Sequence, residues 1–166
     1  MKITALEEYG LRCLLSMAQA SESGLVTLRE IAEREKLSVQ YVSKILNMLV
    51  KRGLVESTRG SKGGYRLTRS PEDISLLDVQ LALGQRLFDG RFCDQHSGLV
   101  VLCPHDGPGC GVRSLWNILT QHIERILKHT TLAHIMGREE KVLENLTKEL
   151  RRSLDEENKM NSKEAL

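Results

Sequence analysis

Residues 38–67 read SVQYVSKILNMLVKRGLVESTRGSKGGYRL, and this stretch decides the fold of the chain. Its first part repeats apolar residues at helical spacing and predicts a helix with one buried face, made of Val42, Ile45, Leu46 and Leu49. Gly53 is expected to end that helix. Two short alternating segments, 54–58 and 65–68, then flank a glycine-rich turn and predict a β-hairpin with a basic tip.

Two short helices are expected before this stretch, because Thr4–Glu7 and Thr27–Glu30 both have the spacing of a capping box. Two short helices, a third helix with a polar outer face and a basic hairpin follow one another in the order of a winged helix-turn-helix. The predicted fold class is therefore mainly α, with a small β-hairpin wing. In this fold the third helix enters the major groove of DNA by its N-terminal turn, and the wing touches the backbone or the minor groove.

The chain is expected to continue in three parts after a winged domain over residues 1–84. Residues 85–111 form an irregular, glycine-rich loop, and a loop of this length in a small domain is usually functional. Residues 112–136 begin with a long apolar helix, whose stripe contains Val112, Trp116, Leu119, Ile123 and Ile126. A second copy of the chain is the simplest partner for this dimerisation helix, although part of the stripe can pack on its own domain. Residues 137–166 read as a charged helix with a thin apolar stripe, and we expect its last dozen residues to be frayed or disordered.

Charge is distributed unevenly along the 166 residues, although the net charge is only +2. Residues 1–70 hold twelve basic and seven acidic residues, and eight of the basic ones lie between Lys36 and Arg69, where Glu56 is the one acid. Charge alone fits a solvated surface as well as a polyanionic partner, and the order of the elements favours the second, double-stranded DNA. The six aromatic residues are too few for a base-stacking single-strand binder.

Several other classes are disfavoured by local context. No apolar run approaches the length of a membrane helix, and Glu7 and Glu8 stand where a signal peptide needs its apolar core, so we expect a cytoplasmic protein without a membrane partner. The sequence GSKGG at 60–64 lacks the Ser or Thr after lysine, and the following helix, that a P-loop requires. No nucleophile–base spacing is evident, so no enzyme activity is expected.

Three cysteines, Cys93, Cys103 and Cys110, lie in the irregular loop with nine and six residues between them. A structural disulfide is a poor explanation in a reducing cytoplasm, whereas thiolates are natural ligands of iron–sulfur clusters and of zinc. The spacing is looser than the two-residue gaps of zinc fingers, which weakens the case for a structural zinc site. Cys13, beside Leu14 in the first helix, is instead expected to be a small buried apolar residue.

The chain resembles the bacterial winged-helix transcription regulators typified by IscR, NsrR and CymR in the sequences MKIT (1–4), EYGLR (8–12), SVQYV (38–42), GLV (53–55) and RGSKGGYRL (59–67). The resemblance covers about residues 1–136 and implies a homodimer joined by the long helix. It implies that DNA is contacted from the third helix and the wing by Ser38, Gln40, Tyr41, Lys44 and Arg59, with Lys62 beside them at the basic tip. In the cluster-binding members the three loop cysteines hold an iron–sulfur cluster, which implies that role for Cys93, Cys103 and Cys110.

The chain departs from the family pattern at three places. The gaps between its cysteines are longer, Arg113 replaces a histidine of IscR-like members, and Ser43 replaces a glutamate of their recognition helix. Glu8 matches the acidic residue that NsrR-like members present to the cluster from the other subunit, so it is the favoured fourth ligand. Its alternative role is to compensate the dipole of the first helix.

Together these features predict a homodimeric DNA-binding regulator whose operator binding is controlled by an iron–sulfur cluster of the 2Fe–2S or 4Fe–4S type. The cluster would sense redox state, nitric oxide or iron–sulfur status. Two alternatives stay open: a metal-free switch in which two loop cysteines form a disulfide, and a regulator stabilised by zinc.

Overall fold

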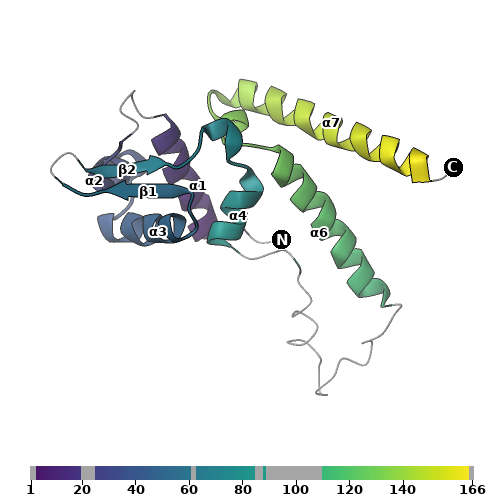
Figure 1. The fold of residues 1–166 in the computed structure, drawn as a ribbon, viewed down its shortest axis with the longest axis horizontal. Coiled ribbons are helices and arrows are strands. Elements are labelled where there is room, and N and C mark those ends of the chain that lie inside the picture. The colour runs from purple at the N-terminus through teal and green to yellow at the C-terminus, as the bar shows by residue number, and fades with distance from the viewer. Residues whose placement is uncertain (1–2, 20–24, 61–62, 85–87, 89–109, 165–166) are drawn as a thin grey trace, which may run out of the picture.

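The computed structural model describes residues 3–19, 25–60, 63–84, 88 and 110–164, and side chains as far as residue 152 (Figure 1). The body of the molecule contains the hairpin of β1 (Val55–Thr58) and β2 (Gly64–Leu67) and four helices, α1 (Ala5–Ala18), α2 (Leu28–Glu35), α3 (Val39–Lys51) and α4 (Leu76–Leu83). The chain also forms two 3₁₀ turns, η1 (Pro71–Asp73) and η2 (Ala133–Ile135), and two long helices, α6 (Gly111–His129) and α7 (Glu139–Glu164). This order confirms a mainly α winged helix-turn-helix with a small wing and a long helix after it.

The helices of the body begin at the capping residues that their sequences predict. In α1 the Thr4 hydroxyl accepts the Glu7 N–H at 3.2 Å, while the Glu7 carboxylate accepts the Thr4 N–H at 2.8 Å. The same reciprocal pair begins α2 and α4. Ser38 begins α3 by accepting the N–H of Tyr41 at 3.2 Å. Each cap satisfies a backbone donor that a helix start otherwise leaves without a partner.

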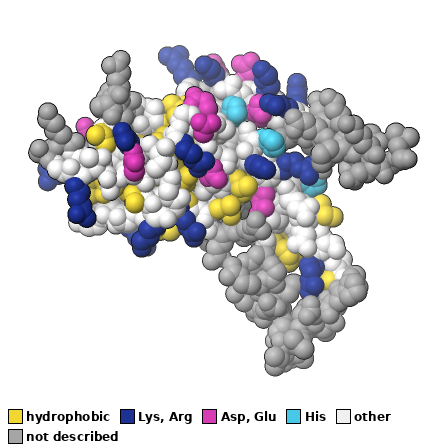
Figure 2. Space-filling view, viewed as in Figure 1, with side chains coloured by type: hydrophobic (Ala, Val, Ile, Leu, Met, Phe, Trp, Pro, Cys, Tyr) yellow, Lys and Arg dark blue, Asp and Glu magenta, His cyan; other side chains and the backbone are white. Residues whose placement is uncertain are grey.

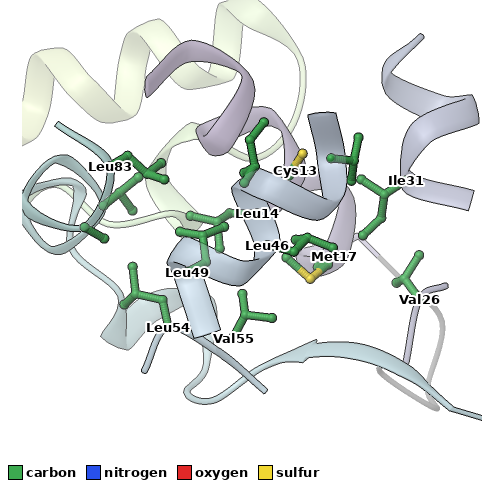
Figure 3. Packing of buried hydrophobic residues seen from close by; sticks show 14 of the residues in the cluster. Cys13, Leu14, Met17, Val26, Ile31, Leu46, Leu49, Leu54, Val55 and Leu83 are labelled. Carbon is green, nitrogen blue, oxygen red and sulfur yellow. The ribbon is translucent and has the colours of Figure 1, made fainter. Parts of the chain in front are cut away.

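The hydrophobic core lies between α1, α2, α3, α4 and β1 (Figure 3). The apolar face predicted for α3 is fully buried, and it consists of Val42, Ile45, Leu46 and Leu49. Leu14 of α1 and Ile31 of α2 belong to the same cluster and are equally buried. Cys13 is also fully buried, as predicted, and loss of water around the sulfur raises the pKa of its thiol to about 12.

The wing is fixed to the body through its second strand. Its strands are antiparallel, with Val55 of β1 opposite Leu67 of β2. Two backbone hydrogen bonds of 2.9 and 2.8 Å join Tyr65 of β2 to Val26, which precedes α2. Near the tip, Gly60 has a φ of +115°, a conformation that side chains with a β-carbon rarely adopt. The glycine therefore permits the turn, and the pairing with Val26 sets the direction in which the wing leaves the body.

The long helix α6 is fastened to the body at its C-terminal end by residues 130–132, which we call the strap. The Leu76 N–H donates to the Thr130 carbonyl at 2.7 Å, and the Leu132 N–H donates to the Ile74 carbonyl at 2.9 Å. The Leu132 side chain is fully buried in the core. From this attachment α6 leaves the body (Figure 1). Its N-terminal half exposes five large apolar side chains, those of Val112, Leu115, Trp116, Ile118 and Leu119.

The C-terminal helix corrects one of our expectations. We predicted that the last dozen residues are frayed or disordered, but the helix α7 runs to Glu164. The sequence after Gly137 contains no glycine or proline and is rich in strong helix formers, and Glu144 and Lys148 stand at the spacing of a helical ion pair. These local preferences account for a helix without a broad apolar face. None of the helices in the described part of the chain combines the length and apolar character that a membrane crossing needs.

Candidate functional site

The N-terminal end of α3 presents most of the residues that we expected to contact DNA. Ser38, Gln40 and Lys44 are exposed, away from the buried face of the helix. Figure 2 shows Lys and Arg side chains along the edge of the body that α3 forms. The Ser38 hydroxyl accepts a backbone N–H as the helix cap, and its own proton stays available for a phosphate oxygen. Because a helix N-terminus also attracts anions, this end of α3 suits a DNA backbone as well as base edges.

Tyr41, the fourth of the residues expected on α3 to contact DNA, is engaged within the protein. It is half-buried, and its ring meets the ring of Tyr9 in α1 edge-on, with 5.9 Å between the centroids. The Arg12 guanidinium lies 5.5 Å from the centre of the Tyr9 ring and donates to the Glu35 carboxylate at 2.8 Å. That hydrogen bond raises the pKa of Arg12. The contacts of Tyr41, Tyr9, Arg12 and Glu35 therefore join the recognition helix α3 to α1 and α2.

The sequence analysis overlooked Tyr9 and Arg12, which support Tyr41 from behind. Their three-residue spacing places both on one face of α1, and that spacing was the available signal. It says nothing, however, about which residue of another helix they meet. The contact with Tyr41 depends on how α1 and α3 cross.

Seven of the eight basic residues between 36 and 69 lie in the described part of the chain, and two of these seven form ion pairs within it. Arg66 of β2 forms a cross-strand ion pair with Glu56 of β1, and Arg69 pairs with Asp78 at 3.2 Å. Lys62 lies outside the described residues. The exposed basic side chains of this region are those of Lys36, Lys44, Lys51, Arg52 and Arg59. They lie between the end of α2 and the wing, with α3 among them, and form a basic surface around the recognition helix.

Of the three cysteines predicted to hold a cluster, Cys93 and Cys103 lie outside the described residues. Cys110 is half-buried and is the N-cap of α6, where its Sγ accepts the Arg113 N–H at 3.5 Å. Within the part of the chain that the structure describes, no three His, Cys, Asp or Glu side chains converge on a possible metal site. One predicted ligand is therefore located at the start of α6, and the grouping of all three stays a prediction.

Glu8 is exposed in the first turn of α1. Its neighbour Glu7 packs against Gly84, the residue that caps the end of α4, so closely that an added β-carbon on Gly84 would lie 2.0 Å from Glu7 Oε1. The cysteine-bearing segment starts directly after Gly84. The beginning of α1 and the end of α4 are therefore neighbours within one subunit. That Glu8 is a ligand of the iron–sulfur cluster in the other subunit stays a prediction.

Comparison with known proteins places these features in a family. Residues 3–138 match the Rrf2 family, described as iron-dependent transcriptional regulators. The protein rrf2 of Nitratidesulfovibrio vulgaris (strain Hildenborough) is 35% identical over 136 residues, which are 82% of this chain and 87% of that protein. Among solved structures, IscR of T. potens is similar with a TM-score of 0.59 and 32% identity, over 80% of this chain and 84% of that one.

A second solved structure, CymR, the global cysteine regulator of B. subtilis, is similar with a TM-score of 0.61 and 30% identity, over 80% of this chain and 94% of that one. These findings confirm the resemblance seen in the sequence and agree with the winged-helix fold. Helix α7 begins at Glu139, directly after the residues that match the family. The chain therefore belongs to the Rrf2 family of transcriptional regulators, and it is not an enzyme.

Proposed function

We propose that the chain acts as a homodimer whose binding to an operator in double-stranded DNA is controlled by an iron–sulfur cluster. Cys93, Cys103 and Cys110 hold the cluster, with Glu8 of the partner subunit as the fourth ligand. The donor chemistry fits, because thiolates are the usual ligands of such clusters. When bound, the cluster supplies iron that reacts with oxygen or nitric oxide, so that its state can serve as a signal.

The position of Cys110 is the observation that carries this proposal. The residue ends the cysteine-bearing segment and also caps α6 through the Arg113 N–H. A metal-bound thiolate and a free thiol differ in charge, so a change of ligation acts directly on the first turn of α6, where the helix dipole favours negative charge. The other end of α6 is fixed to the body by the strap. A change at Cys110 can therefore re-aim the recognition helices of a dimer, which must fit half-sites about 34 Å apart.

The proposed DNA contacts divide into base reading and phosphate binding. The Gln40 amide has the donor and acceptor that a bidentate contact with adenine requires. Lys44 neutralises phosphates, and Arg59 on the wing fits a minor groove, whose negative potential attracts arginine. The set is completed by Ser38, Tyr41 and Lys62.

Anaerobic purification, absorption spectroscopy and assays of iron and acid-labile sulfide test the cluster. We expect a brown protein whose sulfur-to-iron charge-transfer bands are lost in Cys103→Ala and kept in the control Cys13→Ala, since Cys13 is buried in the core. Cys110→Ser and Cys110→Ala should both lose the bands. Serine also caps a helix, so Cys110→Ala should be less stable than Cys110→Ser by about 1 kcal/mol. A wild-type protein that is colourless and free of iron and sulfide would overturn the proposed cluster.

A metal-free thiol switch is the second candidate function. Similarity to the cysteine regulator CymR and the half-buried thiol of Cys110 favour it. In this case a peroxide accepts two electrons from two of the loop thiols, which become a disulfide. A colourless protein whose DNA affinity changes on oxidation and recovers with a dithiol reductant would support this function over the cluster.

Binding to a duplex selected by the wild-type protein from a random library tests the DNA contacts. Lys44→Ala should weaken binding to most sequences and reduce the slope of log K against log salt by about 1, because one phosphate contact is lost. Gln40→Ala should instead change the preferred base at one position of each half-site. Lys141→Ala, which removes an equally exposed lysine from α7, is the control. If Gln40→Ala and Arg59→Ala both leave operator binding unchanged, the proposed docking is wrong.

A further inference from the structure

The exposed apolar face of α6 is wider than the surface that a single neighbouring helix can cover. Its members are between 39% and 65% exposed: Val112, Leu115, Trp116, Ile118 and Leu119. Hydrophobic side chains are visible at the surface along α6 in Figure 2. At about 100° per residue these five positions span an arc of about 160°. The seam of a two-helix pair is a narrower stripe, so pairing of α6 with a second α6 leaves part of this arc in water.

Helix α7 has an apolar face that its own subunit covers only in part. Val142 and Leu146 are partly buried, whereas Leu143 is 65% and Leu150 is 41% exposed. The four residues lie on one side of the helix, because at about 100° per residue their positions fall within an arc of about 100°.

The base of α7 is fixed to η2. The Asn145 side chain donates to the His134 carbonyl at 3.4 Å, and His134 Nε2 lies 3.9 Å from the Glu149 carboxylate. From this base α6 and α7 diverge, as Figure 1 shows. Helix α7 therefore does not cover the N-terminal half of α6 in its own subunit, and each of the two apolar faces needs another partner.

We propose that α7 of each subunit packs along the N-terminal half of the partner subunit's α6. The lengths are sufficient, since α7 has 26 residues and spans about 39 Å, and α6 has 19 residues and spans about 28 Å. The net charges are opposite in sign, because the N-terminal half of α6 has one charged residue, Arg113, whereas α7 has eight acidic and six basic residues. The two unpartnered apolar faces are thereby buried together.

This inference rests on the homodimer proposed above. It adds that α7 of the partner subunit covers the part of the α6 face that the pairing of the two α6 helices leaves exposed. In an antiparallel pair of α6 helices, the start of each helix lies beside the end of the other. That end leads through η2 directly into the α7 of the same subunit. Leu143, in the second turn of α7, is then close to the start of the partner subunit's α6, and the two pairs of helices form a four-helix interface.

Photo-cross-linking of the full-length protein tests the contact. Benzoylphenylalanine is placed in the chain instead of Leu143, and dimers of isotopically light and heavy subunits are irradiated. We expect light–heavy peptide pairs that join α7 to residues 111–119. Cross-links confined to one subunit, or joining α7 to α7, would overturn the inference and leave the homodimer intact. A protein that is monomeric by light scattering would overturn both.

A pair of double variants measures the contribution of this contact. Leu143→Gln with Leu150→Gln should raise the dissociation constant of the dimer by more than about a hundredfold, because four leucines per dimer lose their buried position. Glu144→Gln with Lys148→Gln changes the opposite, exposed face of α7 and keeps the net charge, and should change the constant less than about threefold. Subunit exchange, with circular dichroism to verify the fold, gives both values. Equal weakening by the two double variants would contradict the proposed packing.

Discussion

Replacing Gly10 by alanine tests how closely α1 packs on α4. A β-carbon added at Gly10 would lie 2.1 Å from Leu83 Cδ1, whereas ordinary van der Waals contact begins at 3.4 Å. Leu83 is only 5% exposed, so its side chain has little room to move away. Overpacking of this kind costs about 2 kcal/mol, and the higher helix propensity of alanine offsets about 1 kcal/mol. We therefore expect Gly10→Ala to lower the free energy of unfolding by about 1 kcal/mol.

Urea unfolding followed by circular dichroism measures this change, at a fixed protein concentration because the proposed dimerisation would couple to stability. The same substitution in a Leu83→Ala background is the control. Once the leucine side chain is removed the collision disappears, and Gly10→Ala should then stabilise the fold by about 1 kcal/mol through helix propensity. The sign of the effect thus reverses between the two backgrounds. If Gly10→Ala stabilises both equally, α1 and α4 are not in close contact and the reasoning is refuted.

Three further predictions concern the core, a helix cap and a thiol. Leu132→Ala should lower the free energy of unfolding by about 3 kcal/mol, because it leaves a cavity where the strap enters the core; urea titration measures it. Ser75→Ala removes the hydroxyl that accepts the Asp78 N–H at 3.1 Å and should cost about 1 kcal/mol in a thermal melt, whereas an unchanged melt would mean that the cap is unimportant. Cys13, whose pKa burial raises to about 12, should resist iodoacetamide in the native protein and react in urea, as mass spectrometry can show. Because the unfolded chain ionises this thiol first, the same shift lowers stability as the pH rises from the ordinary thiol pKa towards 12.

Much of the winged domain could be predicted because several local signals agree. Thr4 and Ser38 have the side chains that cap helices, and the structure places a helix directly after each. The apolar spacing in α3 permits only one buried face, and Leu46 and its neighbours occupy it. Gly60 allows a backbone conformation that other residues resist, and the turn of the wing lies there. Such signals depend on neighbouring residues and hardly at all on the rest of the fold.

The remaining features depend on contacts between distant segments. The edge-on contact of Tyr41 with Tyr9 follows from the crossing of two helices, which the spacing in either helix does not specify. The extent of α7 was underestimated because we gave too much weight to its polar composition and too little to its helix propensity. Convergence of Cys93 and Cys103 with Cys110 depends on the path of the chain between them, and a spacing rule for cysteines cannot supply that path. The ligand set therefore stays a proposal, whereas the recognition helix is located.

Because the strap holds only the C-terminal end of α6, the helix can tilt about that end. Its hydrogen bonds from Leu76 and Leu132 hold one end of the helix, and Cys110 lies at the other end. Over a helix of about 28 Å, a tilt of about 5° about the C-terminal end moves the N-terminal end by about 2.5 Å. The reverse also holds, because a small displacement imposed at Cys110 is converted into rotation of the anchored body that contains α3. A change of ligation at the sulfur of Cys110 would in this way alter the angle at which α3 meets the DNA duplex.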